Sequence, residues 1–244
     1  MAGRRITECD RMTRIIDILE RFLDGVKDDN PFSLVLKGGT ALAVHHLPKH
    51  RESEDLDFDA PAEFRSKNSE VVQYIKDSLE KLRKDGVIKG YDIPKAVFAS
   101  TDRFHMTVLL MTHVRYQTKI DLTYRSMPEQ LEMEGQLRFY TKERMLVDKL
   151  LTFTSRGELK DIYDISLLLE KVDAGSFKES IKVAGLVQRA IVRCCGNDTL
   201  VDFRKEMRAT DLRFRHLKES GVDSFLTRTA RNLRRFENEL RKSG

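Results

Sequence analysis

The sequence predicts an α+β fold, in which a mixed β-sheet flanked by helices is followed by a C-terminal helical domain. Two observations carry this prediction. Short segments rich in β-branched and aromatic residues are interleaved with helical segments up to residue 140. From Thr141 onward, apolar residues recur only at the spacing of three and four that is typical of amphipathic helices. We therefore expect two domains, a core over residues 1–141 and a helical domain over residues 142–244.

The core is expected to alternate between helices and strands. Residues 8–25 carry apolar side chains at helical spacing, and the Asp-Asp-Asn-Pro run at 28–31 ends that helix. An apolar run at 32–36 has strand length and leads into two glycines, after which 41–46 predicts a short helix and 63–84 a long charged one. The remaining segments are expected to be strands: 55–59, 96–100, 104–112, 117–124 and 137–140.

The second domain is expected to contain only helices. Thr141 precedes the first of them and has the side chain of a good N-cap. The helical periodicity covers residues 141–153, 159–169, 177–194, 199–219 and 222–242. Residues 201–244 hold 12 basic and 7 acidic side chains, which accounts for the whole net charge of +5. This basic segment is either a surface for phosphates or an ordinary solvated helical surface.

Composition excludes several classes of protein. No apolar stretch approaches the length of roughly 18 to 20 residues that a membrane-spanning helix needs, so we expect no membrane segment. The N-terminus lacks the apolar region of a secretory signal. The cysteines, Cys9, Cys194 and Cys195, show no metal-binding spacing, which is typical of a protein in the reducing cytoplasm.

The strongest local signal is the acidic run from Asp55 to Asp59. In a strand, Asp55, Asp57 and Asp59 project to one side while Leu56 and Phe58 project to the other. Three neighbouring carboxylates repel one another, and a divalent cation would compensate for that repulsion. Oxygen ligands favour Mg²⁺ or Mn²⁺ over zinc. The alternative is an exposed acidic edge strand that discourages pairing with other chains.

Two further elements fit a phosphoryl-transfer site. Asp121 lies on a predicted strand, on the side opposite Ile120 and Leu122, and could complete a metal site with Asp55 and Asp57. Otherwise Asp121 is an edge or turn aspartate. Lys37-Gly38-Gly39-Thr40 stands between an apolar strand and a helix, where glycines let a phosphate approach the backbone. A tight strand-to-helix connection would explain the same glycines.

The order of these motifs resembles a known family. The segments Lys37-Gly38-Gly39-Thr40-Ala41-Leu42 and Arg51-Glu52-Ser53-Glu54-Asp55-Leu56-Asp57-Phe58, followed by Asp121, are similar to the AbiEii nucleotidyltransferase toxins of the polymerase β-like (minimal nucleotidyltransferase) superfamily. A second block looks like that family's helical motif: Asp148-Lys149-Leu150-Leu151, Arg156, and Lys160-Asp161-Ile162-Tyr163-Asp164-Ile165. The matched segments span about residues 34 to 169.

The resemblance implies the fold and the chemistry of a nucleotidyltransferase. Such enzymes transfer a nucleoside monophosphate from an NTP to an acceptor hydroxyl with the help of Mg²⁺ or Mn²⁺. Asp55 and Asp57 would be metal ligands, and Asp121 a third ligand that also accepts the proton of the attacking hydroxyl. Lys37, Gly38, Gly39 and Thr40 would lie against the triphosphate, with Thr40 in the place of the serine that many superfamily members have.

The resemblance extends to residues of the helical motif. Lys149 and Arg156 are seven apart and share a helix face, so they are expected to bind the NTP phosphates, with Lys149 taking a catalytic role. Asp161 and Asp164 would orient them or contact the nucleotide, and Arg51 would reach the phosphates or the acidic run. The alternative is a lattice of salt bridges between helices.

The histidines, by contrast, show no metal-ligand spacing, and His45 and His46 are expected at the surface or at a helix cap.

Three functions remain to be distinguished. The first is the toxin of a toxin–antitoxin pair that modifies RNA, with tRNA as the candidate acceptor and a cognate antitoxin as partner. The second keeps the chemistry but has a small molecule or a protein as acceptor. The third is an NTP-binding module without turnover. The sequence gives neither the preferred base, nor the oligomeric state, nor the role of Asp59.

Overall fold

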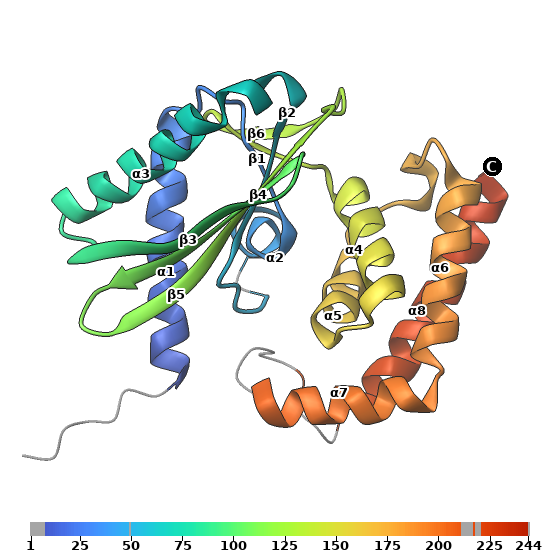
Figure 1. Cartoon of the computed structure of the whole chain (residues 1–244). Helices are drawn as coiled ribbons and strands as arrows, with labels where there is room; N and C mark the ends of the chain where they lie inside the picture. Colours follow the sequence, from blue (N-terminus) through green and yellow to red (C-terminus); the bar gives the residue numbers. More distant parts are fainter. Residues whose placement is uncertain (1–7, 49, 211–216, 218–220, 244) are drawn as a thin grey trace, which may run out of the picture. The chain divides into compact units, whose positions relative to one another are not determined.

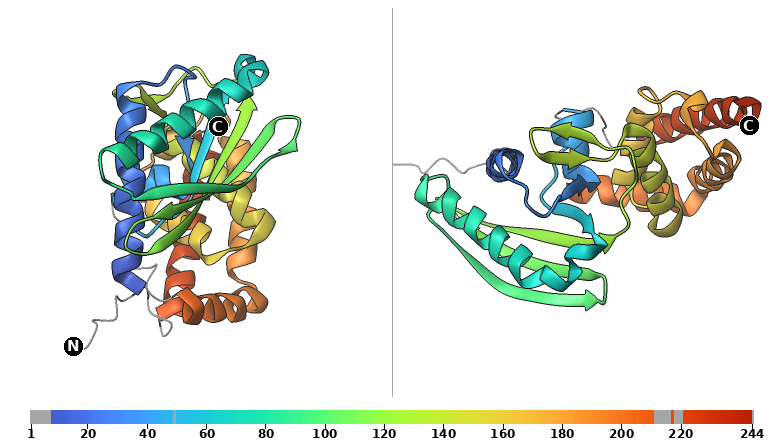
Figure 2. Two further views of the ribbon diagram at one scale, coloured as in Figure 1. Left: turned by 60° about the vertical axis from the view of Figure 1, so that its left-hand side comes forward. Right: turned by 90° about the horizontal axis from the view of Figure 1, so that it is seen from above.

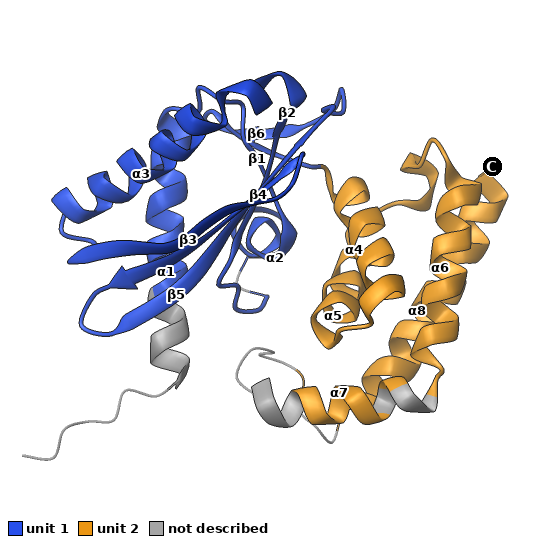
Figure 3. Ribbon diagram, in the orientation of Figure 1, with its two compact units in different colours: residues 1–140 blue, residues 141–244 orange. Residues whose placement is uncertain are grey.

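The chain is seen in a computed structural model that describes residues 8–48, 50–210, 217 and 221–243, with the side chains of 8–14, 197, 198, 200 and 207–210 left out of the description. It divides into two compact units, residues 1–140 and 141–244 (Figure 3).

The first unit is built on one seven-stranded mixed sheet with the strand order β3-β4-β5-β2-β1-β7-β6 (Figure 1). Strands β2 and β5 are parallel, as are β1 and β7, and the remaining neighbours are antiparallel. The strands are β1 Val35–Lys37, β2 Leu56–Pro61, β3 Gly90–Ser100, β4 Arg103–Met111, β5 Arg115–Arg125, β6 Glu132–Glu134 and β7 Leu137–Phe139.

One face of this sheet is apolar because buried side chains alternate with more exposed ones along β4 and β5. Their buried positions are Phe104, Met106, Val108 and Leu110 on β4 and Tyr116, Thr118, Ile120, Leu122 and Tyr124 on β5. Helices α1 (Glu8–Asp28) and α3 (Asn68–Lys84) contact each other, and they also contact β7 and β3 respectively. They cover the apolar face (Figure 2), which leaves the alternate positions of the central strands on the opposite, open face.

Short helical segments complete the first unit. Helix α2 (Gly38–Ala41) begins directly after β1 and continues into a π-helical turn, η1 (Leu42–His46). A 3-10 segment, η2 (Ala62–Lys67), leads from β2 into α3. The diglycine turn and the segment that follows it therefore lie between β1 and the polar loop before β2.

The second unit is helical throughout its described residues. It comprises α4 Lys142–Arg156, α5 Leu159–Leu168, the 3-10 turn η3 Ala174–Ser176, α6 Ser180–Cys194, α7 Asn197–Thr210 and α8 Val222–Ser243. Thr141 caps α4 by accepting a hydrogen bond from the backbone N–H of Arg144, as its side chain predicts. Phe153, Val187, Phe203 and Leu233 are among its fully buried side chains.

The expected α+β fold is confirmed, and the differences in detail have physical reasons. Strand β3 begins at Gly90 rather than at 96, because the edge of a sheet accommodates Pro94 with a register shift between Asp92 and Lys95. Strand β6 is three residues long and was not expected. Helix α7 ends at Thr210, and residues 211–216 and 218–220 of the helix expected over 199–219 lie outside the described residues, as does His216.

None of the helices in the described part of the chain is long and apolar enough to cross a membrane.

Candidate active site

Asp57 and Asp121 lie side by side on the open face of the sheet. Parallel pairing of β2 with β5 puts the Cα of Asp57 directly opposite that of Asp121. Neighbouring strands are about 4.8 Å apart and side chains at paired positions point to the same face. Because Leu56, Phe58, Ile120 and Leu122 are all buried on the other face, both carboxylates are fixed on the half-exposed side.

Asp55 lies in the loop that precedes β2, and its side chain is held against strand β5. Its Oδ1 accepts a hydrogen bond of 3.2 Å from the backbone N–H of Lys119, two residues before Asp121. Its backbone carbonyl accepts a hydrogen bond from the hydroxyl of Thr40, which also lies 2.9 Å from the Ser53 hydroxyl. Thr40 is fully buried. Its hydrogen bonds therefore attach the residue after the diglycine pair to the loop that carries Asp55.

The diglycine turn is packed directly against this centre. Gly38 has φ of 72°, and a Cβ added to it would lie 2.2 Å from Oδ2 of Asp57. A Cβ at Gly39 would lie 2.4 Å from the guanidinium Nη2 of Arg51, which is itself buried and donates to the carbonyl of Glu52 at 2.9 Å. Only glycine leaves room at both positions for these side chains to approach the backbone.

His105 contacts the centre from strand β4. Antiparallel pairing of β4 with β5 puts it opposite Asp121, and its Nδ1 donates to Asp121 Oδ1 at 2.5 Å. Its Nε2 lies 3.3 Å from the hydroxyl oxygen of Thr107, within hydrogen-bond distance. Sequence reasoning missed His105. If Thr112–Val114 had been taken as the turn of a hairpin, the two strands on either side of it would have paired residue 105 with residue 121.

Asp59 points to the same face but is fully buried among cations and a hydroxyl. Its Oδ1 lies 2.5 Å from Lys37 Nζ, while Oδ2 accepts from the Tyr140 hydroxyl at 2.6 Å and lies 3.2 Å from Arg125 Nε. Both oxygens are therefore already bound. Asp59, whose role the sequence left open, is thus a buried carboxylate that binds Lys37, Arg125 and Tyr140. The ammonium group of Lys37 is directed to this carboxylate.

The helical-motif residues form a second cluster, within the second unit. Lys149 is buried and lies 2.7 Å from Asp164 and 3.2 Å from Asp161, two carboxylates with no exposed surface. Arg156 binds Asp161 with both Nε and Nη2, at 2.8 and 3.0 Å. Helices α4 and α5 thus hold two cations and two carboxylates in one network, and a bidentate pair of this kind fixes the guanidinium plane.

The predicted site residues accordingly fall into one cluster in each unit. The first unit holds the residues around the turn and the open face: Lys37, Gly38, Gly39, Thr40, Arg51, Asp55, Asp57 and Asp121. The second unit holds the other cluster: Lys149, Arg156, Asp161 and Asp164.

The model of the family described as nucleotidyl transferase AbiEii toxin, type IV TA system, matches residues 17–238. The match runs through both units and includes every residue of both clusters. The chain belongs to this family. It is a nucleotidyltransferase of the AbiEii toxins, a family that implies an NTP substrate, a divalent metal and an antitoxin partner.

Solved structures show the same fold as this AbiEii-family chain. JHP933 from Helicobacter pylori is 17% identical with a TM-score of 0.69, covering 97% of this chain and 95% of that one. MenT4, a nucleotidyltransferase toxin from Mycobacterium tuberculosis, is 18% identical with a TM-score of 0.55, covering 97% of this chain and 94% of that one. No curated protein matches the chain in sequence.

Proposed function

We propose that this nucleotidyltransferase transfers a nucleoside monophosphate from an NTP to a hydroxyl of RNA, with tRNA as the expected acceptor, in a Mg²⁺- or Mn²⁺-dependent reaction. We further propose that residues 1–141 form the nucleotidyltransferase core and residues 142–244 a helical domain that contributes cationic residues.

The carboxylate centre has the donors that a hard cation requires. Asp55, Asp57 and Asp121 would supply only oxygen ligands, and the nitrogen donor that the described residues place beside them is His105, which is bound to Asp121. This composition suits Mg²⁺ or Mn²⁺ rather than zinc. Bound there, the metal would neutralise charge on the phosphoryl oxygens of the transferred group.

The diglycine turn is proposed to hold the triphosphate. Gly38 and Gly39 carry no side chain that would keep a phosphate from the backbone, and the following residues form the first turns of a helical segment. Arg51, lying against Gly39, supplies a positive charge at the same point. Lys37, the last residue of β1, is proposed to hold this turn in position through its ion pair with Asp59 of β2.

Asp121 is proposed to accept the proton of the attacking hydroxyl. Its Oδ1 already receives the Nδ1–H of His105, which fixes the plane of the carboxylate and leaves Oδ2 to take the proton. His105 thereby acts as a positioning residue, held in turn by Thr107.

Lys149 and Arg156 are proposed to bind phosphates from the helical domain. Asp161 and Asp164 stabilise both cations in fixed orientations, so that little side-chain entropy remains to be lost when an anion binds.

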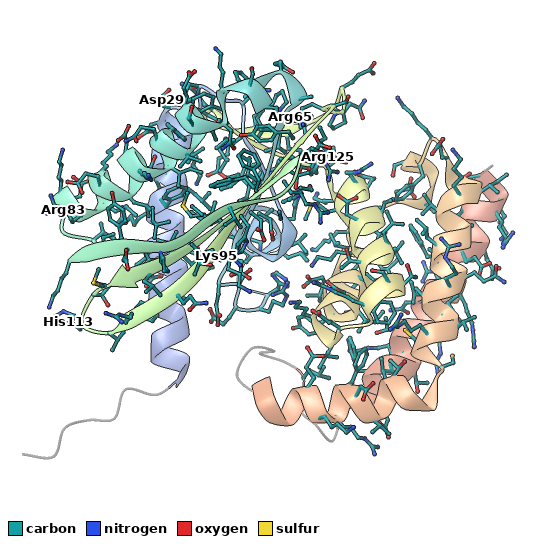
Figure 4. All side chains as sticks on the ribbon, in the orientation of Figure 1. Asp29, Arg65, Arg83, Lys95, His113 and Arg125 are labelled. Carbon is teal, nitrogen blue, oxygen red and sulfur yellow. The ribbon has the colours of Figure 1, made fainter. Side chains whose placement is uncertain are left out.

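An RNA acceptor is supported by the cations around the carboxylate centre. Lys95 and Lys119 both lie opposite Thr107 in the register of β3, β4 and β5, and both are exposed on the open face. Arg125 follows on β5, and Figure 4 labels it together with Lys95. Exposed Lys and Arg side chains supply most of the affinity of proteins for a phosphate backbone.

One observation supports the proposal most strongly: the backbone of Gly38 lies against Asp57, with Asp121 beside it in register. The test is incubation of the protein with α-labelled NTPs, Mg²⁺ and total RNA, comparing wild type with Asp57→Ala. We expect label in RNA with wild type and a loss of about 100-fold or more with the variant. Asp92→Ala, which removes an exposed carboxylate of β3, is the matched control. Equal transfer by wild type and Asp57→Ala would refute the assignment.

Two outcomes would support the alternatives. Label that enters a small molecule or a protein, identified by mass spectrometry, would keep the chemistry and change the acceptor. Calorimetric binding of NTP and Mg²⁺ without pyrophosphate release in any mixture of acceptors would indicate a binding module without turnover.

A further inference from the structure

A second set of potential metal ligands lies apart from the carboxylate centre. His45 and His46 end the π-helical turn η1, and Glu132 begins β6. One ligand atom from each lies within 4.8 Å of the other two. Strands β1 and β7 separate β6 from β2 in the sheet, so this group is distinct from the site of Asp57.

The π-turn is what brings consecutive histidines to the same neighbour. The backbone N–H of Leu47 donates to the carbonyl of Leu42 at 2.7 Å, the wide i to i+5 hydrogen bond of a π-helix. Such turns interrupt helices rarely and often at functional sites. The side chain of His46 is 1% exposed, so the expectation of a surface position is wrong for this residue, whereas His45 is partly exposed at 19%.

The outer nitrogen of each ring faces a hydrogen-bond acceptor. Nε2 of His46 lies 2.8 Å from the carbonyl oxygen of Tyr140, which can only accept, so Nε2 carries the proton and the lone pair of the neutral ring is on Nδ1. Nδ1 of His45 faces Oε2 of Glu134 at 3.5 Å, and Glu134 is itself anchored by Lys27 at 2.7 Å. Metal-binding histidines typically have an acceptor of this kind on the nitrogen that does not bind the metal.

The inner nitrogens face one shared carboxylate. Oε2 of Glu132 lies 2.9 Å from Nε2 of His45 and 3.9 Å from Nδ1 of His46. Ligands about 2.0–2.1 Å from a tetrahedral zinc are about 3.3 Å from one another, a value between these two distances. The ring of His45 is stacked on Phe139 with centroids 4.0 Å apart and planes at 8°, so its direction is fixed before any ion binds.

We propose that His45, His46 and Glu132 bind a Zn²⁺ ion that fixes the helical segment carrying the diglycine turn to β6, with a water molecule as fourth ligand. Two imidazoles and one carboxylate suit zinc and not magnesium. Since α2 and η1 run without interruption from Gly38 to His46, the ion would hold the far end of the segment whose beginning contacts Asp57.

The proposal is tested by metal titration of the full-length protein after treatment with a chelator. Zn²⁺ is added in the calorimeter, and Co²⁺ is used as a visible probe of tetrahedral nitrogen and oxygen coordination. We expect one equivalent of Zn²⁺ to bind and to raise the melting temperature. Glu132→Gln should weaken binding by more than 10-fold, and Glu134→Gln by about 10-fold or more through the orientation of His45.

Three comparisons make the outcome decisive. Glu132 is 38% exposed, so Glu132→Gln is expected to fold, which circular dichroism checks. His113→Ala, in the exposed turn between β4 and β5 that Figure 4 labels, should bind zinc as wild type does. Asp57→Asn should bind zinc normally, which separates this site from the catalytic one. The proposal is overturned if wild type takes up no zinc, or if Glu132→Gln binds it unchanged.

Discussion

Replacing Gly38 by alanine tests the contact between the diglycine turn and the carboxylate centre. A Cβ there would lie 2.2 Å from Asp57 Oδ2, whereas ordinary contact begins at 3.4 Å. The carboxylate must therefore move by about 1 Å, a displacement that costs a catalytic group on the order of 100-fold in rate. The positive φ adds about 1–2 kcal/mol of backbone strain.

Gly86→Ala provides a control that introduces the same backbone strain without a steric contact between the added Cβ and another residue. Gly86 has φ of 73°, and a Cβ there would meet nothing within 4 Å. Both variants are expected to lose about 1–2 kcal/mol of stability, which lowers the melting temperature by roughly 2–8 °C. Only Gly38→Ala should lose transfer activity, measured as initial rates with α-labelled NTP at a temperature where both are folded.

The reasoning would be refuted if Gly38→Ala transferred label as fast as Gly86→Ala, because the contact with Asp57 would then be irrelevant to the chemistry. A large loss of activity in Gly86→Ala would also refute it, since strain alone would then explain the effect.

Three further predictions concern stability and reactivity. Asp59→Ala should lower the free energy of unfolding by about 2–3 kcal/mol, because it leaves partly buried cations without their carboxylate; an unchanged denaturation midpoint would contradict this. Burial raises the pKa of the Cys194 thiol to about 12, so brief alkylation at pH 8 should modify the exposed Cys195 and spare Cys194. Peptide mapping that finds the two cysteines equally labelled would contradict this prediction. Burial also raises the pKa of Glu206, so ionising this carboxyl lowers the free energy of unfolding as the pH rises above 4.5. Glu206→Gln should therefore make the melting temperature depend less on pH between pH 4.5 and 7. A pH profile equal to that of wild type would exclude Glu206 as the cause.

The carboxylate centre could be predicted from sequence because it depends on strand periodicity. Alternation fixed the face of Asp57 and that of Asp121, since Leu56, Phe58 and Ile120 had to be buried on the other side. That both strands would be neighbours in the sheet does not follow from periodicity. It follows from the pairing of β2 with β5 across an intervening helix and two strands.

Other parts of the site depend on contacts between distant segments. The burial of Asp59 requires Tyr140, 81 residues away, and alternation predicts its face but not that partner. His105 depends on the register of a hairpin. His46 could not be predicted as buried, because the turn that buries it is π-helical, and helical periodicity assumes 3.6 residues per turn.

Binding of Mn²⁺ in the presence of a non-hydrolysable NTP tests the central claim most directly, with the free ion measured by electron paramagnetic resonance. The claim is that Asp57 and Asp121 share a cation beside the diglycine turn. It predicts that Asp57→Asn and Asp121→Asn each bind Mn²⁺ at least 10-fold more weakly than wild type, while Asp92→Asn binds it unchanged. Wild-type affinity in the Asp57 and Asp121 variants would contradict it.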